Sequence, residues 1–260
     1  MSKRKALGQH FLSNRKVLGR IIKAIDPQEE DRIIEIGAGR GILTYPLAER
    51  AGQVVSIETD SVLLPALQEK ESSRLSIIHA DVLTVQFHEI FPDSPVKIVG
   101  NLPYSISSPI LFKVLSEQDL FSLCVFLIQK EVAERLCAGP GTKKYAPLSI
   151  LFHNYFQSRM RFIVPPSAFS PPPRVDSALV SLHKRETPLV SIEDRTGFQK
   201  FLRYVFRHRR KMLRNNLKSM NVPLSKLESA FDRAEIPQKA RPEEVSLEQF
   251  TSLFDSIHSP

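Results

Sequence analysis

The sequence contains only two cysteines in 260 residues, Cys124 and Cys137. Two cysteines are too few for a disulfide framework, and their spacing does not match that of metal ligands. No run of residues is long and apolar enough to span a membrane. The basic residues near Met1 are followed by the polar stretch 6–10 rather than by the apolar core of a signal peptide. We therefore expect both cysteines to fill the core, no metal site, no membrane association and a cytoplasmic location.

Positive charge, in contrast, is in excess. The sequence has 36 Lys and Arg against 28 Asp and Glu, a formal net charge of +8 and a pI near 9.5. Two stretches, residues 1–23 and 200–218, are rich in Lys and Arg and contain no acidic residue. Such acid-free basic blocks are typical of contact with a polyanion. We expect the second block in particular to bind nucleic acid.

The apolar pattern along the chain predicts an α/β fold. Short apolar runs at residues 32–36, 54–57, 75–78, 97–99 and 123–128 alternate with helical patterns at 43–51, 63–70 and 109–116. Strands that alternate with helices form a parallel sheet covered on both faces. A helix at 146–156 and strands at 158–164 and 175–183, separated by a proline-rich loop, extend this sheet to seven mostly parallel strands.

The pattern changes after residue 185. Residues 186–194 are polar and contain proline, and only helical patterns follow, at 198–218, 224–234 and 247–257. The sequence therefore predicts two domains. Residues 1–185 form an α/β domain, and residues 195–260 form a small, basic, all-α domain.

A glycine-rich turn follows the first predicted strand, in the run EIGAGRG at residues 35–41. The dinucleotide-binding fingerprint would require glycine at position 42, where Ile42 stands. A phosphate-binding loop would require a Lys-Ser or Lys-Thr pair, which is absent. The pattern instead resembles the first motif of class I methyltransferases. Taken alone, it is also compatible with an ordinary strand-to-helix turn.

Acidic residues end the next two predicted strands. Glu58 follows the second strand, where nucleoside-binding α/β folds place an acid for the ribose hydroxyls. Asp81 follows the third, where a carboxylate can accept a hydrogen bond from an adenine amino group. With Gly37, Gly39 and Val82, these acids form an expected nucleoside-cofactor site beyond the carboxyl ends of the strands.

The tetrapeptide Asn101-Leu102-Pro103-Tyr104 follows the fourth predicted strand. It is similar to the [N/D/S]-P-P-[Y/F/W] motif of enzymes that methylate exocyclic amino nitrogens. The lone pair of an adenine N6 is delocalised into the ring, so two acceptors are needed to favour a pyramidal nitrogen. The Asn101 side-chain oxygen and the Leu102 carbonyl are the candidates, and Pro103 stiffens the loop. Tyr104 would stack on the base, a contact worth about 1–3 kcal/mol.

Together these motifs resemble the rRNA adenine N6,N6-dimethyltransferase family, and most closely its small-subunit branch. The resemblance covers nearly the whole chain. It includes the run GQHFL at residues 8–12, the motifs above, the run FSPPPRVDSA at 169–178 and the basic segment at 206–217. Ala38 stands where many members have proline, and His10 where asparagine is frequent. Histidine can still donate and accept hydrogen bonds.

The resemblance implies a class I methyltransferase fold with S-adenosylmethionine as cofactor. It implies that Gln9, His10 and Leu12 close over the cofactor, that Asn101 contacts it, and that Phe169 stacks on the target base opposite Tyr104. The implied substrate is a pair of adjacent adenines in a hairpin loop near the 3′ end of small-subunit (16S) rRNA, each methylated twice. The implied partner is an immature small ribosomal subunit, and we expect a monomer.

Three alternatives stay open at this point. The chain could act mainly as an RNA-binding factor in ribosome assembly, with catalysis secondary. It could methylate large-subunit rRNA, as resistance methyltransferases do. A DNA adenine methyltransferase would use similar chemistry, although no DNA-recognition module is visible in the sequence.

Overall fold

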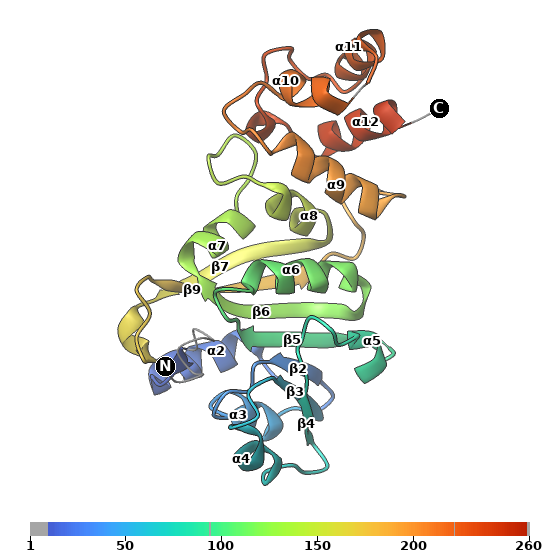
Figure 1. Cartoon of the computed structure of the whole chain (residues 1–260). Coiled ribbons are helices and arrows are strands. Elements are labelled where there is room, and N and C mark those ends of the chain that lie inside the picture. Colours follow the sequence, from blue (N-terminus) through green and yellow to red (C-terminus); the bar gives the residue numbers. More distant parts are fainter. Residues whose placement is uncertain (1–9, 94, 221, 259–260) are drawn as a thin grey trace. The chain divides into compact units, whose positions relative to one another are not determined.

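The computed structural model describes residues 10–93, 95–220 and 222–258, which divide into two compact units (Figure 1). The first unit contains the described residues up to 133 together with residues 157–184. The second contains residues 134–156 and those from 185 onward. Residues 134–156, which the sequence pattern places inside the first domain, therefore belong to the second unit. The chain passes between the units near residues 133, 156 and 184.

A seven-stranded sheet forms the centre of the first unit, in the order β4-β3-β2-β5-β6-β9-β7. Strands β2 to β6 pair in parallel and β9 pairs antiparallel with β6, so the expected mostly parallel sheet is confirmed. The central strands are buried on both faces, which explains why they are mostly apolar. The strands are β2 (Arg32–Ile36), β3 (Gln53–Glu58), β4 (Leu75–His79), β5 (Val96–Asn101), β6 (Phe121–Gln129), β7 (Phe156–Val164) and β9 (Ser177–Lys184).

Helices flank this sheet along the chain, and several lie where the sequence pattern predicts them. They are α2 (Arg15–Ile25), α3 (Thr44–Ala48), α4 (Leu64–Gln68), α5 (Phe87–Ile90), α6 (Ser107–Ser116) and α7 (Lys130–Leu136). Helix α2 was not predicted, although its signals are present. Asn14 caps it by accepting hydrogen bonds from the backbone N–H groups of Lys16 and Val17. Its buried residues Val17, Ile21 and Ile25 recur every four positions.

The segment before α2 is tied to the proline-rich loop. Strand β1 (Phe11–Leu12) pairs antiparallel with β8 (Phe169–Ser170). The N–H groups of Ser13 and Asn14 both donate to the Ala168 carbonyl, at 2.8 and 3.3 Å. Residues 10–14 and 168–171, which lie far apart in sequence, therefore form one small structure.

The second unit is helical, as expected, with a core rich in phenylalanine. The rings of Phe198, Phe201 and Phe254 lie 5.4–6.2 Å apart between their centroids. Its helices are α8 (Pro147–Tyr155), α9 (Arg195–Val205), α10 (Leu213–Leu217), α11 (Leu224–Arg233) and α12 (Leu247–His258). Of the helices in the described part of the chain, none is both long and apolar enough to cross a membrane.

The prediction of one continuous helix over residues 198–218 is wrong. Helix α9 ends at Val205 and α10 begins only at Leu213. A continuous helix would place Arg207, Arg210 and Lys211 three or four positions apart on neighbouring surface sites, where like charges destabilise a helix. The turn also lets Arg209 donate to the carbonyl of Tyr145, at 2.8 Å, and to that of Lys143.

Candidate active site

A cavity lies at the carboxyl ends of β2, β3, β4 and β5, where ligands bind in open α/β sheets. It encloses about 750 Å³ of empty space, including a part open to solvent. The lining residues are His10, Phe11, Ile36, Gly37, Gly39, Ile57, Glu58, Thr59, Ala80, Asp81, Val82, Asn101, Leu102, Pro103, Tyr104, Ile106 and Ile110.

The glycine-rich turn after β2 is held open by one carboxylate. The Oε2 atom of Glu58, at the end of β3, accepts a hydrogen bond of 2.8 Å from the Gly39 N–H. Its Oε1 accepts from the N–H groups of Thr59 and Asp60, at 2.9 and 2.8 Å. Gly37 and Gly39 have φ values of +79° and +57°, which side-chain-bearing residues rarely adopt. Glu58 is thus fixed beside the backbone of the turn, with its carboxylate facing the cavity.

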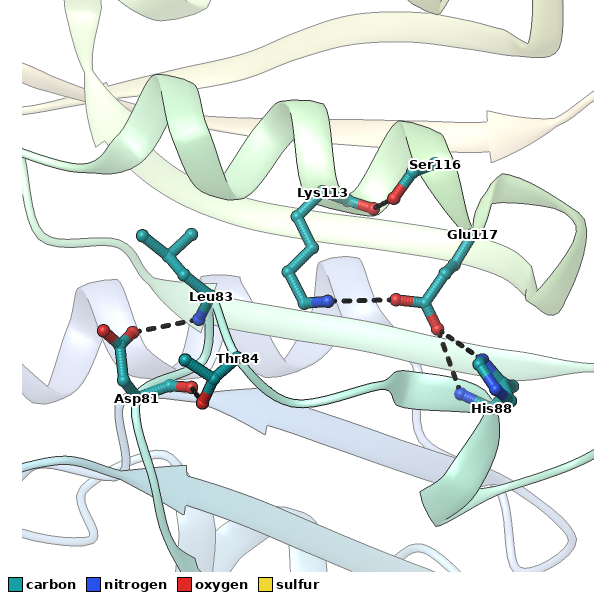
Figure 2. Close-up of polar contacts among 7 residues, drawn as sticks. All are labelled: Asp81, Leu83, Thr84, His88, Lys113, Ser116 and Glu117. Atoms are coloured by element: carbon teal, nitrogen blue, oxygen red, sulfur yellow. Dashed lines mark hydrogen bonds and ion pairs between the residues drawn. The ribbon is translucent and has the colours of Figure 1, made fainter. Parts of the chain in front are cut away.

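Asp81 is fixed in a similar way beyond the end of β4 (Figure 2). Its Oδ1 accepts from the Leu83 N–H at 2.9 Å, and its carbonyl accepts from the Thr84 hydroxyl at 2.8 Å. Among the described residues, Oδ2 has no hydrogen-bond donor, and it remains available to a ligand. Val82, the next residue, is buried and lines the cavity beside it.

An ion cluster connects the segment after Asp81 to α6. Glu117 Oε1 pairs with Lys113 Nζ at 3.1 Å, while Oε2 accepts from the His88 N–H and contacts His88 Nδ1, both at 3.1 Å (Figure 2). Lys113 also lies 4.8 Å from the centroid of the Phe87 ring. These contacts hold α5 against the end of α6, and therefore stabilise the chain that carries Asp81.

The loop 101–104 leaves β5 with two oxygen acceptors free. The Leu102 N–H donates to the Leu127 carbonyl at 3.0 Å, which continues the parallel ladder with β6. The Asn101 Nδ2 donates to the His10 carbonyl at 2.9 Å, which fixes the side-chain amide. Within the described part of the chain, neither Asn101 Oδ1 nor the Leu102 carbonyl accepts a hydrogen bond. Two free acceptors on adjacent residues match the two hydrogens of an amino group.

Two rings lie side by side at this end of the cavity. The His10 and Tyr104 centroids are 5.4 Å apart, with an interplanar angle of 36°. His10 Nδ1 lies 2.9 Å from the Pro171 carbonyl, which orients the imidazole. The phenol group of Tyr104 is half-buried, and this burial raises its pKa, although a hydrogen bond from Ser177 opposes the shift. Tyr104 is therefore neutral at neutral pH and presents an uncharged ring.

Two expected site residues, Leu12 and Phe169, lie outside this cavity. Leu12 lines a neighbouring cavity of about 540 Å³, which also touches Gly37, Gly39 and Asn101. Phe169 is 4% exposed and packs in the core cluster with Leu12, so it lines neither cavity. To stack on a base, its ring would have to leave that core. Gln9 lies outside the described residues.

The sequence interpretation missed the apolar lining of the cavity. Ile57 precedes Glu58 and Thr59 follows it, while Ile106 and Ile110 project from the start of α6. The position of Ile57 and Thr59 beside the strand-end acid was a usable signal. The two isoleucines of α6 follow Tyr104 at short spacing but otherwise read as ordinary core residues.

A buried acid lies beneath the glycine-rich turn. Glu35 is 1% exposed, and its Oε2 accepts a hydrogen bond of 2.6 Å from the Ser56 hydroxyl. Burial raises the pKa of Glu35 to about 7, while the hydrogen bond from Ser56 opposes this shift and the charge of Glu58 adds to it. Glu35 lines the second cavity, so its charge state affects the floor of the site.

The basic block in the second unit divides into two kinds of residue. Arg207, Arg210 and Lys211 are exposed, and among the described residues none of them forms an ion pair. Arg209 is only partly exposed because it binds the two loop carbonyls described above. The exposed members are free to bind phosphate groups, whereas Arg209 has a structural role.

Comparison with known proteins gives consistent matches over the whole chain. A model of the family described as "Ribosomal RNA adenine dimethylase" matches residues 1–259. Proteins of Xanthomonas euvesicatoria pv. vesicatoria (strain 85-10) and Xanthomonas oryzae pv. oryzae (strain PXO99A), both named "Ribosomal RNA small subunit methyltransferase A", are 43% and 42% identical over 252 residues. These matches cover 96% of this chain and 94% of each relative.

Two solved structures share the fold. A dimethyladenosine transferase from Plasmodium falciparum has a TM-score of 0.81 and 28% identity, over 94% of this chain and 96% of that one. The 23S rRNA methyltransferase ErmE has a TM-score of 0.70 and 28% identity, over 95% of this chain and 99% of that one. Both covered shares include the sheet and the helical region that follows it.

Proposed function

Because the chain belongs to the ribosomal RNA adenine dimethylase family, we propose that it dimethylates the N6 amino groups of two adjacent adenines in small-subunit (16S) rRNA. The enzyme is an rRNA adenine methyltransferase with the class I fold. The choice of the small subunit rests on the names of relatives at 41–43% identity, whereas ErmE, which acts on 23S rRNA, is 28% identical. The adenines lie in a hairpin loop near the 3′ end of the rRNA.

The residues around the cavity fit S-adenosylmethionine, which when bound supplies the methyl group. Glu58 binds the ribose hydroxyls, and the free oxygen of Asp81 accepts from the adenine amino group of the cofactor. Val82 packs against that adenine, and the turn at Gly37 and Gly39 lets the cofactor approach the backbone. The combination of an apolar lining with fixed carboxylates supports this assignment.

The loop 101–104 binds the target base. Asn101 Oδ1 and the Leu102 carbonyl accept the two N6 hydrogens of adenine, which makes the nitrogen lone pair available for attack. Tyr104 stacks on the base, which must be turned out of the RNA loop to enter the site. Pro103 fixes the direction of the Leu102 carbonyl. The observation that carries the proposal is this pair of free acceptors in the lining of the cavity.

The remaining assignments concern the residues that enclose the ligands, the RNA partner and the cellular location. Gln9, His10 and Leu12 close over the cofactor, and Phe169 reaches the target base by leaving its buried position. The exposed basic residues of the second unit bind RNA backbone on an immature small subunit, and the enzyme acts as a monomer. The activity is cytoplasmic, because the Xanthomonas relatives are bacterial and bacterial ribosomes mature in the cytoplasm.

The first test offers labelled S-adenosylmethionine with unmethylated small subunits, large subunits and duplex DNA in parallel. We expect N6,N6-dimethyladenosine from small subunits alone. Label only from large subunits or DNA would contradict the substrate, and no label despite cofactor binding would favour an assembly factor.

The Asn101→Ala variant tests the catalytic assignment within the same assay. It removes one of the two acceptors, so we expect transfer to fall by a factor of about 100 or more, since removing a group that acts on the transition state commonly costs about 3 kcal/mol. Cofactor binding, measured by calorimetry, should change little. An equal loss of binding and transfer would show that Asn101 has a structural role instead.

A further inference from the structure

The hydroxyl group of Tyr104 forms a hydrogen bond with a residue of β9. No residue of this strand lines the cavity. The hydroxyl oxygen of Tyr104 lies 2.5 Å from the Oγ of Ser177, and either group can donate the hydrogen bond. Ser177 is the first residue of β9 and is fully buried. Stacking on a base requires only the ring of Tyr104, so this hydroxyl contact needs a separate explanation.

Ser177 is held rigidly from both sides. It pairs with Gln129, the last residue of β6, in the antiparallel ladder. The carbonyl of its neighbour Asp176 accepts a hydrogen bond of 3.0 Å from the Lys130 N–H, and the Asp176 carboxylate pairs with Lys130 Nζ at 3.7 Å. The Ser177 hydroxyl is therefore a fixed point at the end of the sheet.

Tyr104, in contrast, is carried by a loop with few other restraints. Its carbonyl accepts from the Ser107 hydroxyl at 3.3 Å, and its ring contacts His10. Neither of these contacts involves the phenol oxygen. The hydrogen bond to Ser177 fixes the far end of the ring, and so the direction in which the Tyr104 side chain extends from the loop.

We propose that Ser177 is a positioning residue, whose hydroxyl holds the Tyr104 ring in the place where it stacks on the target adenine. The proposal rests on the proposed function, because it assumes that Tyr104 meets the target base. Ser177 itself contacts neither cofactor nor substrate. It affects the reaction only through Tyr104. We therefore expect the effects of substituting the two residues to be coupled rather than additive.

A double-mutant cycle tests this coupling directly. The variants are Ser177→Ala, Tyr104→Phe, which keeps the ring and removes only the hydroxyl, and the two combined. A hydrogen bond of this kind contributes about 1 kcal/mol, so each single change should lower kcat on unmethylated small subunits by about 5-fold. The KM for S-adenosylmethionine should be unchanged, and the Tm should fall by only about 2–4 °C. The double variant should lose no more than either single one, because the same interaction is removed in each case.

Ser181→Ala is the matched control. Ser181 lies on the same strand and is also fully buried, but its hydroxyl has no hydrogen-bond partner among the described residues. It should retain the wild-type kcat, which separates the contact to Tyr104 from the general effect of losing a buried serine hydroxyl.

Two outcomes would overturn the assignment. Losses that multiply, to about 25-fold in the double variant, would show that the residues act independently. A Tyr104→Phe variant with full kcat would show that the Tyr104 hydroxyl is not needed for the reaction. This outcome would overturn the assignment even if Ser177→Ala were too unstable to assay. Wild-type enzyme that leaves small subunits unmethylated would instead refute the proposed function and, with it, the assignment of Ser177.

Discussion

Glu35 is an almost fully buried acid beneath the glycine-rich turn. The Ser56 hydroxyl donates a hydrogen bond to it, and Glu58 nearby carries a charge of the same sign. Burial therefore favours the neutral form and raises its pKa from 4.5 to about 7. In the unfolded chain the same carboxyl group has a pKa near its ordinary value of 4.5. The folded state thus binds a proton more tightly than the unfolded state over the range between these values.

This difference gives Glu35 a pH-dependent effect on stability. The penalty is absent below about pH 4.5, where both states are protonated, grows as the pH rises, and is complete above about pH 7. The side chain of Glu35→Gln is neutral at every pH. As the pH rises from 5 to 8, the unfolding free energy of this variant should therefore increase by about 2–3 kcal/mol relative to that of the wild type. Urea denaturation at both pH values measures it. Parallel pH profiles would show that Glu35 is ionised in the folded protein.

At this scale, the polar and glycine residues that line the cavity were predictable from the sequence, whereas of the apolar lining residues only those inside a motif, such as Val82 and Leu102, were. A glycine-rich turn, an acid at a strand end and an Asn-x-Pro-Tyr turn can each occur for structural reasons. Their combination at successive strand ends is rarely explained without a binding site. Ile106 and Ile110 look the same in sequence whether they line a cavity or fill the core. The burial of Phe169 was not foreseeable either, because it depends on the pairing of β1 with β8, which are distant in sequence.

Among the elements, α2 and the interrupted helix of the second unit show opposite uses of basic residues. Helix α2 contains Arg15, Lys16, Arg20 and Lys23 and still forms, because its apolar face packs on the core and Asn14 caps its first turn. The segment after α9 carries Arg207, Arg209, Arg210 and Lys211 where the helix would continue, and the helix ends at Val205. Charge density alone therefore does not predict where a helix ends.

The cap of α2 can be tested on its own. Asn14→Ala removes the acceptor for the N–H groups of Lys16 and Val17, and should lower the unfolding free energy by about 1 kcal/mol. Asn14→Asp keeps the acceptor and adds a negative charge at the helix N-terminus, so it should retain the stability. Urea denaturation of the three proteins measures the difference. Equal losses in both variants would mean that the amide of Asn14, rather than the cap, matters.

For the whole molecule, charge is the property that the sequence predicts in sign but not in position. The net charge of +8 points to RNA, yet Arg209 serves the fold of the second unit while Arg210 and Lys211 are exposed. Although α2 and the break after α9 were missed, much of the strand and helix order follows from the apolar pattern, because local periodicity determines it. The assignment of residues 134–156 to the second unit does not, because it depends on contacts with residues far along the chain.

The exposed pair should contribute to binding through counterion release. Replacing Arg210 and Lys211 by Gln should weaken binding to small subunits and make the slope of log K against log salt shallower by about 1.5–2. The same exchange at Lys70 and Arg74, exposed residues of the first unit, is the control and should leave the slope unchanged. Binding at several KCl concentrations with fixed Mg²⁺ gives the slopes. Equal slopes for wild type and the Arg210/Lys211 variant would exclude this pair from the RNA contact.

The discontinuity of the two units also has a consequence for how the protein is made. Strand β6 pairs with β5 on one side and with β9 on the other, and β9 ends at Lys184. During translation, the nascent chain must therefore carry β6 with one edge unpaired while the ribosome synthesises residues 130–176. Helix α8 is synthesised in the same interval. The helices α9 and α12, which complete its unit, are synthesised much later. A chain stalled before residue 177 holds an open sheet edge and an unpartnered helix, so we expect chaperone binding to be greatest in that window.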